Sequence, residues 1–255
     1  MAAHHSTSRA EVKRLAPATC VHHIFAKAPG QCCAMFFIRM LLIAAMTAVM
    51  IAAMNMGVGQ AMNLHDAVRA ADLAEVKTLL GAGAEIDARN EAQETPLLVA
   101  VLQDQTEIAR ALIAAGADIN AQAANRDSPW LLAGASGRTE IIRAMIPKGP
   151  DFTKRNRYGG NALIPACERG HVETIELLLT TAIDVNHVNN LGWTCLLEIV
   201  ILGDGGPRHQ RAAQLVLAHG ANPNIADKEG MTPLAHATAR GQTEIAAMIA
   251  GAGGH

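Results

Sequence analysis

Short apolar segments recur from Met62 onward, and turn residues separate them. In Glu173–Thr180 the apolar residues fall at helical spacing. A break at residues 168–171 precedes this segment, and another short apolar stretch precedes the break. The pattern predicts pairs of short helices joined by tight turns.

A tripeptide landmark recurs at the start of each predicted pair with almost no drift. Its copies are Met62-Asn63-Leu64, Thr95-Pro96-Leu97, Ser128-Pro129-Trp130, Asn161-Ala162-Leu163, Thr194-Cys195-Leu196 and Thr232-Pro233-Leu234. The steps between them are 33, 33, 33, 33 and 38 residues. A second landmark keeps the same phase, at Gly83-Ala84, Gly116-Ala117, Gly149-Pro150, Ala182-Ile183 and Gly220-Ala221. Two markers with one period predict an array of six units.

The landmarks also predict where the helices begin and end. A Thr, Ser or Asn can cap the first helix of a unit, and Pro is well tolerated at the first helical position because its missing N–H has no partner there in any case. Glycine favours the left-handed conformation that ends the second helix. Segments such as Asp118–Ala121 then turn outward and return to the next cap.

These motifs, with the 33-residue period, closely resemble the ankyrin-repeat family over residues 62–255. The resemblance implies an all-α solenoid of about six helix-turn-helix units, with hairpin fingers on one side and a concave face formed by the fingers and first helices. The first unit reads as an N-terminal cap. The family is a scaffold for many partners, so its motifs say little about function.

The chain ahead of the repeats predicts a membrane-directed segment. Residues 40–58 carry no charge and follow Arg39, and Gly59-Gln60-Ala61 offers small residues for a signal peptidase. We expect residues 35–61 to be a signal peptide cleaved after Ala61, or an uncleaved anchor of nearly bilayer-spanning length. Residues 1–34 fit neither role and are interpreted as an unstructured or wrongly assigned upstream extension. The repeats are then periplasmic or secreted, or anchored to the inner membrane facing the periplasm.

Composition and charge exclude several classes of function. Residues 62–255 contain 16 Lys and Arg against 22 Asp and Glu, a net charge of about −6. A nucleic-acid partner is not expected, because no basic face is visible. The motifs of serine hydrolases, zinc proteases and phosphate-binding loops are absent from the sequence, so no enzyme activity is predicted. No spacing suits a metal site or a cofactor.

The largest departure from the repeat is the longer step in the fifth unit. Its extra residues fall between the two helices, in the loop that includes Asp204–Gln210. Asp204, Arg208 and His209 place both charge signs within a few residues, beside flexible glycines. Two interpretations remain open, a ligand-binding loop and a tolerated surface insertion in which Asp204 and Arg208 tie the loop to itself.

A second set of candidates comes from aligned positions in the last three units. Glu198 and His236 occupy the same site on successive first helices, while Tyr158 and Trp193 stand in the fingers ahead of their units. One interpretation is a single binding patch of aromatic, carboxylate and imidazole groups. In the other, Trp193 packs across the base of its finger and Glu198 pairs with His236.

Cys167 and Cys195 are the two cysteines within the repeats. Their positions on adjacent first helices differ by five residues, or about 7.5 Å along the axis before the spacing between helices is added. This separation exceeds what a disulfide usually spans, so we expect two free thiols.

The sequence thus predicts a non-enzymatic protein–protein interaction module that acts outside the cytoplasm. The alternative is a small-molecule-binding or sequestering protein that holds a polar ligand with the loop Asp204–Gln210.

Overall fold

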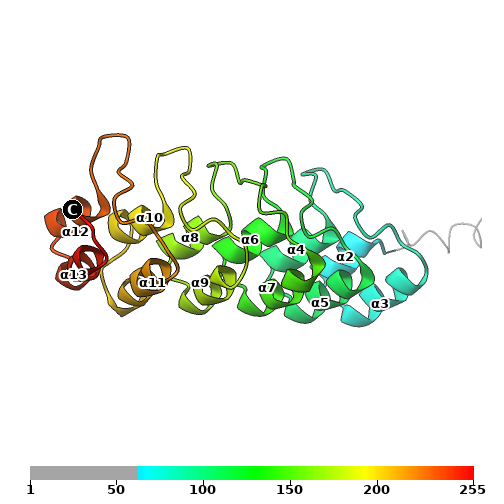
Figure 1. Ribbon diagram of the computed structural model, residues 1–255. Coiled ribbons are helices and arrows are strands. Elements are labelled where there is room, and N and C mark those ends of the chain that lie inside the picture. Colours follow the sequence, from blue (N-terminus) through cyan, green and yellow to red (C-terminus); the bar gives the residue numbers. More distant parts are fainter. Residues whose placement is uncertain (1–61) are drawn as a thin grey trace, which may run out of the picture. The chain divides into compact units, whose positions relative to one another are not determined.

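The computed structural model describes residues 62–255, and the segments expected at residues 1–34 and 35–61 lie outside this part of the chain. The described residues form six pairs of antiparallel helices joined by long loops, with no strand among them (Figure 1). Among these residues, no helix is both long and apolar enough to cross a membrane. The helices are α2 (Leu64–Arg69), α3 (Leu73–Gly81), α4 (Pro96–Leu102), α5 (Thr106–Ala115), α6 (Pro129–Ala135), α7 (Thr139–Met145), the 3₁₀ turn η1 (Ile146–Lys148), α8 (Leu163–Glu168), α9 (Val172–Leu179), α10 (Cys195–Ile201), α11 (Pro207–Ala218), α12 (Pro233–Ala239) and α13 (Thr243–Gly251).

The capping residues do what the sequence predicts. Side-chain oxygens of Thr95, Ser128, Thr194 and Thr232 accept hydrogen bonds from backbone N–H groups in the first turns of α4, α6, α10 and α12. These bonds satisfy donors that a helix start leaves free. Gly116 ends α5 in the left-handed conformation, with a φ of 100°.

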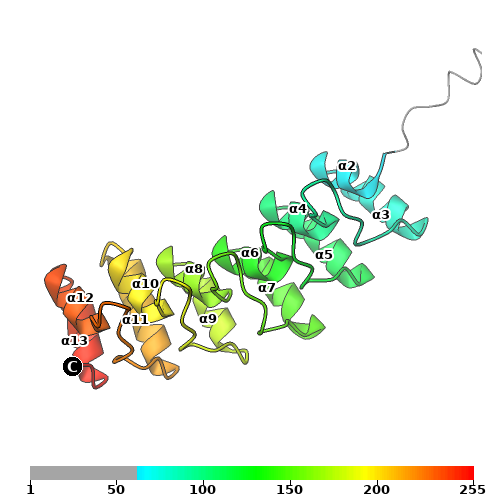
Figure 2. The same cartoon turned by 90° about the horizontal axis from the view of Figure 1, so that it is seen from above.

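Two rows of helices make up the stack, and long loops rise beside one of them (Figures 1 and 2). The first helices α2, α4, α6, α8, α10 and α12 form one row, and the second helices form the other. We call the loops fingers and number each by the unit it leads into, so that the finger of unit four is residues 149–162 and that of unit five is residues 180–194. The surface formed by fingers and first helices is the finger face.

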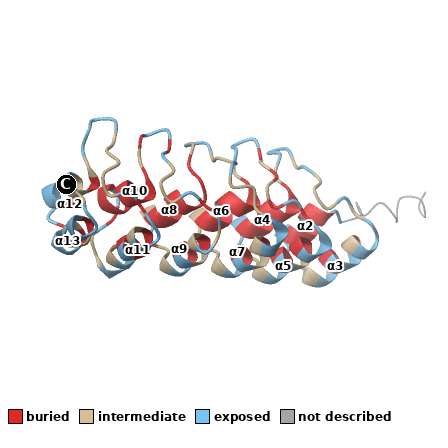
Figure 3. Ribbon diagram, in the orientation of Figure 1, coloured by how far each residue is buried: buried red, intermediate tan, exposed pale blue. Residues whose placement is uncertain are grey.

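The core runs along the row of first helices (Figure 3). Every residue of α10 is buried, whereas α5 buries one face, Ile108, Ala109, Leu112 and Ile113. A first helix has neighbouring first helices on both sides and its own second helix behind it, so few of its positions reach solvent. Small and aliphatic residues suit this close stacking, which explains an aromatic content of only 3%.

The prediction of two free thiols is wrong, because Cys167 and Cys195 form a disulfide with their Cα atoms 5.5 Å apart. The sequence argument placed equivalent positions of neighbouring helices at the same height. Gly134 and Ala162 hold the same two positions one unit earlier, and a Cβ added to Gly134 would lie 2.8 Å from the Cβ of Ala162. Consecutive first helices are therefore staggered, so that the last turn of one meets the start of the next.

Candidate functional site

A groove of about 250 Å³ opens on the finger face between units four and five. The fingers of both units and the helices α8 and α10 enclose it. Its lining residues are Asn156, Arg157, Tyr158, Gly160, Ile164, Pro165, Glu168, Arg169, Asn189, Leu191, Glu198 and Leu202.

The polar wall of the groove is built on a bond between Asn189 and Glu198. Asn189 accepts backbone hydrogen bonds from Leu191 and Trp193 through its Oδ1, which fixes the turn of the unit-five finger. Its Nδ2 then donates to Oε1 of Glu198 at 2.8 Å. This bond ties the finger to α10 and holds a carboxyl group that is only 4% exposed.

The pKa of the Glu198 carboxyl group is unusually high for a glutamate. Its pKa is raised to about 7, mainly by burial and in addition by the nearby carboxylate of Glu168, while the bond from Asn189 acts in the opposite direction. A carboxyl group of this pKa is partly protonated at neutral pH. The groove therefore contains a group whose charge responds to pH and to nearby cations.

Apolar side chains form the rim of the groove. Tyr158, Leu191 and Leu202 are 55%, 49% and 50% exposed, and they belong to the unit-four finger, the unit-five finger and the end of α10. Large exposed apolar groups gathered around a recess are typical of binding surfaces.

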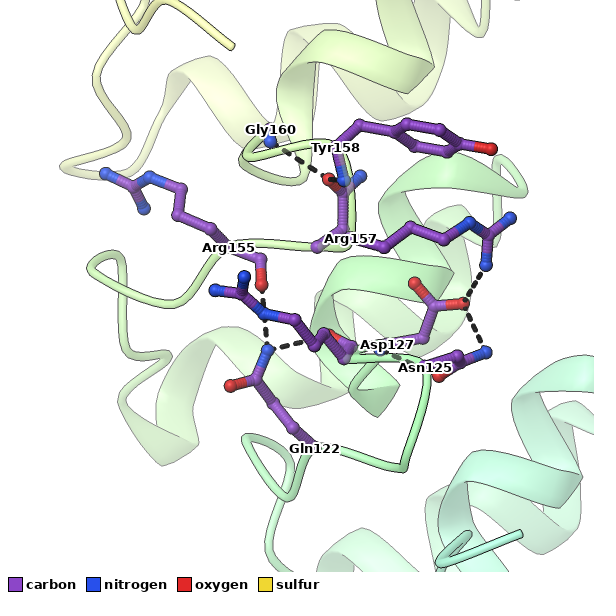
Figure 4. Close-up of polar contacts among 9 residues, drawn as sticks. Gln122, Asn125, Asp127, Arg155, Arg157, Tyr158 and Gly160 are labelled. Carbon is purple, nitrogen blue, oxygen red and sulfur yellow. Dashed lines mark hydrogen bonds and ion pairs between the residues drawn. The ribbon is translucent and has the colours of Figure 1, made fainter. Parts of the chain in front are cut away.

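The two basic residues of the groove both contact unit three, and Figure 4 shows the contact of Arg157. Arg157 pairs with Asp127 at 3.2 Å, and its guanidinium lies 4.9 Å from the centre of the Tyr158 ring. Arg169 donates to the backbone oxygen of Ala135 at 2.8 Å. Gln122 also joins the fingers of units three and four, because its Nε2 donates to the backbone oxygens of Arg126 and Arg155. The contacts of Arg157 and Gln122 fix the unit-four finger, which carries Tyr158, against the unit-three finger.

The structure brings together only part of the predicted patch. Tyr158 and Glu198 both line the groove, whereas Trp193 is half-buried in its finger and His236 lies elsewhere. The predicted pair between Glu198 and His236 is wrong. His236 bonds to Asp227 at 2.6 Å, and this pair repeats, one unit later, the relation of Glu198 to Asn189.

The insertion in unit five lengthens a helix as well as a loop, which corrects the prediction of an elongated loop. Residues 202–206 form the loop, and α11 begins at Pro207 with an additional turn. His209 takes the place that His171 holds in unit four, and its Nε2 bonds to the backbone oxygen of Glu168 at 3.0 Å. The stack thus continues past the insertion with its usual contact between units.

Asp204 and Arg208 do not tie the loop together. Oδ1 of Asp204 instead accepts hydrogen bonds from Nδ1 of His209 at 2.7 Å and from the backbone N–H of Gly206 at 2.9 Å. These bonds hold the pKa of Asp204 below its usual value, with the bond from Gly206 as the main cause. His209 is only 4% exposed, so its ring supports the fold, while Asp204 itself remains exposed.

We expect Asp204→Ala to lower the melting temperature, because Nδ1 of the buried His209 and the N–H of Gly206 lose their acceptor. Arg208→Ala, at an exposed position without an ion pair in residues 62–255, should leave the melting temperature unchanged. Thermal unfolding followed by circular dichroism measures both. Equal melting temperatures for the two variants would argue against the His209–Asp204 bond.

The residues that sequence reasoning missed are Glu168, Asn189, Leu191 and Leu202. The signal for Asn189 was present in the alignment of the repeats, because Asn189 aligns with Asn156 and Asp227, which also accept backbone bonds in their fingers. Exposure of Leu191 and Leu202 is a property of the assembled stack and has no signature in the repeat.

A larger cavity of about 410 Å³ lies at the start of the stack, between α2 and the unit-two finger. Its walls include Asn63, His65, Leu79 and Arg89, and no exposed aromatic side chain. We prefer the smaller groove as the candidate site because apolar rim and charged wall occur together there. Over residues 62–255, no cluster of His, Cys, Asp and Glu is arranged to hold a metal ion.

Comparison with known proteins agrees with this architecture. A family model described as ankyrin repeats (3 copies) matches residues 64–156 and 130–205, and a second, ankyrin repeats (many copies), matches residues 207–249. The ankyrin repeat protein YahD of Escherichia coli (strain K12) is 51% identical over 71 residues, which are 28% of this chain and 35% of YahD. The match therefore spans about a third of that relative.

Solved structures give the same result over most of the repeats. An ankyrin repeat domain from Acinetobacter baumannii AYE is 49% identical with a TM-score of 0.73, covering 75% of this chain and 98% of that domain. The ankyrin repeat protein EF0377 is 41% identical with the same TM-score and the same coverage. The ankyrin repeat domain of Bcl-3, a member of the IkappaB family, is 28% identical with a TM-score of 0.68, covering 77% of this chain and 88% of that domain. With its units, caps and fingers as described, the chain belongs to the ankyrin repeat family.

Proposed function

We propose that this protein is a non-enzymatic scaffold that holds a protein partner in the groove between units four and five, outside the cytoplasm. Ankyrin repeats are protein–protein interaction modules, and the family is typically non-enzymatic. The observation that supports this site is the ring of exposed Tyr158, Leu191 and Leu202 around a recess with a buried carboxyl group. Aromatic anchors beside a recess carry much of the binding energy in protein interfaces.

Two features support a location outside the cytoplasm. The uncharged segment 40–58 has the composition of a signal peptide or anchor. The Cys167–Cys195 disulfide fits an oxidising compartment, because disulfides seldom persist in the cytosol. Mass spectrometry of the protein from its host tests the proposal, and a mature N-terminus at Met62 is the result expected after cleavage at Ala61.

The alternative of a small polar ligand at Asp204–Gln210 has less support. Asp204 and His209 bond to each other and to the backbone of units four and five, and His209 is almost fully buried, so only Oδ2 of Asp204 remains for a ligand. The lining of the groove includes Leu202 but no residue of 204–210.

Photo-crosslinking can locate the partner on the surface. A photoreactive residue placed at Leu191 should capture a protein in the host, while the same residue at Lys77 on α3, an exposed second-helix position, should not. Equal capture from both positions would count against the groove.

With the captured partner purified, we expect Tyr158→Ala to weaken binding at least tenfold, or by about 1.4 kcal/mol or more, because a rim aromatic is lost. Lys148→Ala, at an exposed position in η1 away from the groove, is the matched control and should leave the affinity unchanged. Isothermal calorimetry measures both values. Unchanged affinity for Tyr158→Ala contradicts the assignment of the site.

A further inference from the structure

The groove contains two carboxyl groups without a cationic partner. Neither Glu168 nor Glu198 forms an ion pair with any residue of the described range 62–255. The hydrogen bond that Glu198 receives, from Asn189, reaches Oε1, and no hydrogen bond to its Oε2 is found in that range. Because Glu198 is almost fully buried and lines the groove, Oε2 either faces the groove or lies against other atoms of the protein.

Equivalent positions in the neighbouring units show how unusual this arrangement is. In unit six the finger residue is Asp227 and the helix residue is His236, which bond to each other. In unit four the finger residue is Asn156, and the apolar Pro165 stands on the helix. Unit five alone among these three places a carboxyl group on the helix opposite a neutral amide.

The basic residues nearby do not compensate the two carboxyl groups. Arg157 is paired with Asp127, and Arg169 is bonded to Ala135, both in unit three. His236, on the α12 side of α10, is bonded to Asp227. Within residues 62–255, no positively charged side chain is therefore paired with Glu168 or Glu198.

We propose that the groove receives a Lys or Arg side chain of the protein partner, held between Glu168 and Glu198, with apolar partner residues against Tyr158, Leu191 and Leu202. This inference rests on the proposed function and adds the chemistry of the partner. A cationic head on an aliphatic stem matches a recess with an acidic wall and an apolar rim. A bound ammonium or guanidinium group also supplies the donors that the carboxylate oxygens lack.

Binding of a cation here depends on pH. Glu198 has to lose its proton to form the ion pair, and its pKa is about 7 in the free protein. The groups that face it are Glu168 at the end of α8, Arg169 directly after it, Arg157 in the unit-four finger and Asn189 in its own finger. The ionised fraction of a group with this pKa rises from about 0.09 at pH 6 to about 0.91 at pH 8, so binding should tighten about tenfold over this range.

Selection from a random peptide library displayed on phage tests the inference without a known partner. The full chain serves as bait, and the Tyr158→Ala variant removes peptides that bind elsewhere. We expect the peptides lost with Tyr158→Ala to be enriched in Lys or Arg next to apolar residues. The peptide that binds most tightly is then synthesised with a fluorophore. A peptide without histidine is chosen, so that the peptide itself does not titrate between pH 6 and pH 8. It is compared with an analogue in which Gln replaces the basic residue.

Fluorescence anisotropy at pH 6 and pH 8 gives the affinities. The analogue should bind the native protein at least tenfold more weakly. Glu198→Gln should reduce this difference, because only Glu168 remains to pair with the basic residue, and should remove the pH dependence. Glu168→Gln should weaken the basic peptide and leave a smaller pH dependence, because the pKa of Glu198 falls when the neighbouring charge is removed. Glu198→Gln keeps an oxygen that can accept from Asn189, and its melting curve verifies that it is folded.

The outcomes separate the two proposals. Peptides that need Tyr158 but show no preference for basic residues overturn the inference and leave the groove as the binding site. If no selected peptide depends on Tyr158, the proposed function fails and the inference fails with it.

Discussion

Replacing Cys167 and Cys195 together by alanine should lower the free energy of unfolding by about 3–4 kcal/mol. The disulfide closes a loop with a sequence separation of 28 residues, and a cross-link of this size limits the unfolded chain by about that amount in the chain-entropy model. Alanine adds no atom at either position, because each cysteine already carries a Cβ and the substitution removes only its sulfur. Urea unfolding of the oxidised protein and of the double variant measures the difference.

Reduction of the native protein is the control for this result. Dithiothreitol should reduce the stability of the native protein to that of the double variant and should leave the variant unchanged. Alkylation of the unreduced protein unfolded in urea, followed by mass spectrometry, should leave both residues unlabelled, because the bond and not burial protects them. Labelling of Cys167 or Cys195 under these conditions would show that the bond does not form.

Glu198→Gln should stabilise the protein at pH 8 and leave its stability almost unchanged at pH 4. Because the pKa of Glu198 is about 7 when folded and near its model value of 4.5 when unfolded, the folded state binds the proton more tightly. Stability therefore falls as the pH rises from about 4.5 to 7, and the loss persists above this range. The glutamine does not ionise, so it avoids a cost on the order of 1–3 kcal/mol.

Urea unfolding of native and Glu198→Gln proteins over this pH range measures the difference. Glu168→Gln removes only the neighbouring charge, so we expect it to give a smaller gain with the same sign. A difference between native protein and Glu198→Gln that does not change with pH would mean that the carboxyl group has an ordinary pKa.

The fold could be predicted almost completely because each unit repeats the same helix caps and turn residues. Thr95, Ser128, Thr194 and Thr232 cap helices where the sequence places them, and these signals need no knowledge of tertiary contacts. The stagger between units is different in kind. It depends on how side chains such as Gly134 and Ala162 pack between helices, and this is why the cysteine geometry was predicted wrongly.

The site could be predicted only in part. Tyr158 and Glu198 stood out because they depart from the repeat, and both line the groove. The partner of Glu198 is Asn189, a finger residue nine positions earlier in the chain. The bond between them forms only when the finger folds back onto α10. The apolar rim of Tyr158, Leu191 and Leu202 forms where two fingers and the end of α10 come together in the folded stack, and no motif in the sequence indicates it.

The extra turn of α11 has a consequence for how such proteins diversify. His209 restores the contact with unit four after five additional residues, so the repeat keeps its pitch while the connection between α10 and α11 changes in length. Leu202 of this connection belongs to the rim of the groove, and Asp204 holds His209, whereas the connection contains no finger residue. Foreign peptides grafted beside Leu202 and Asp204, with both kept, would give an engineer a second surface to alter while the fingers keep their shape.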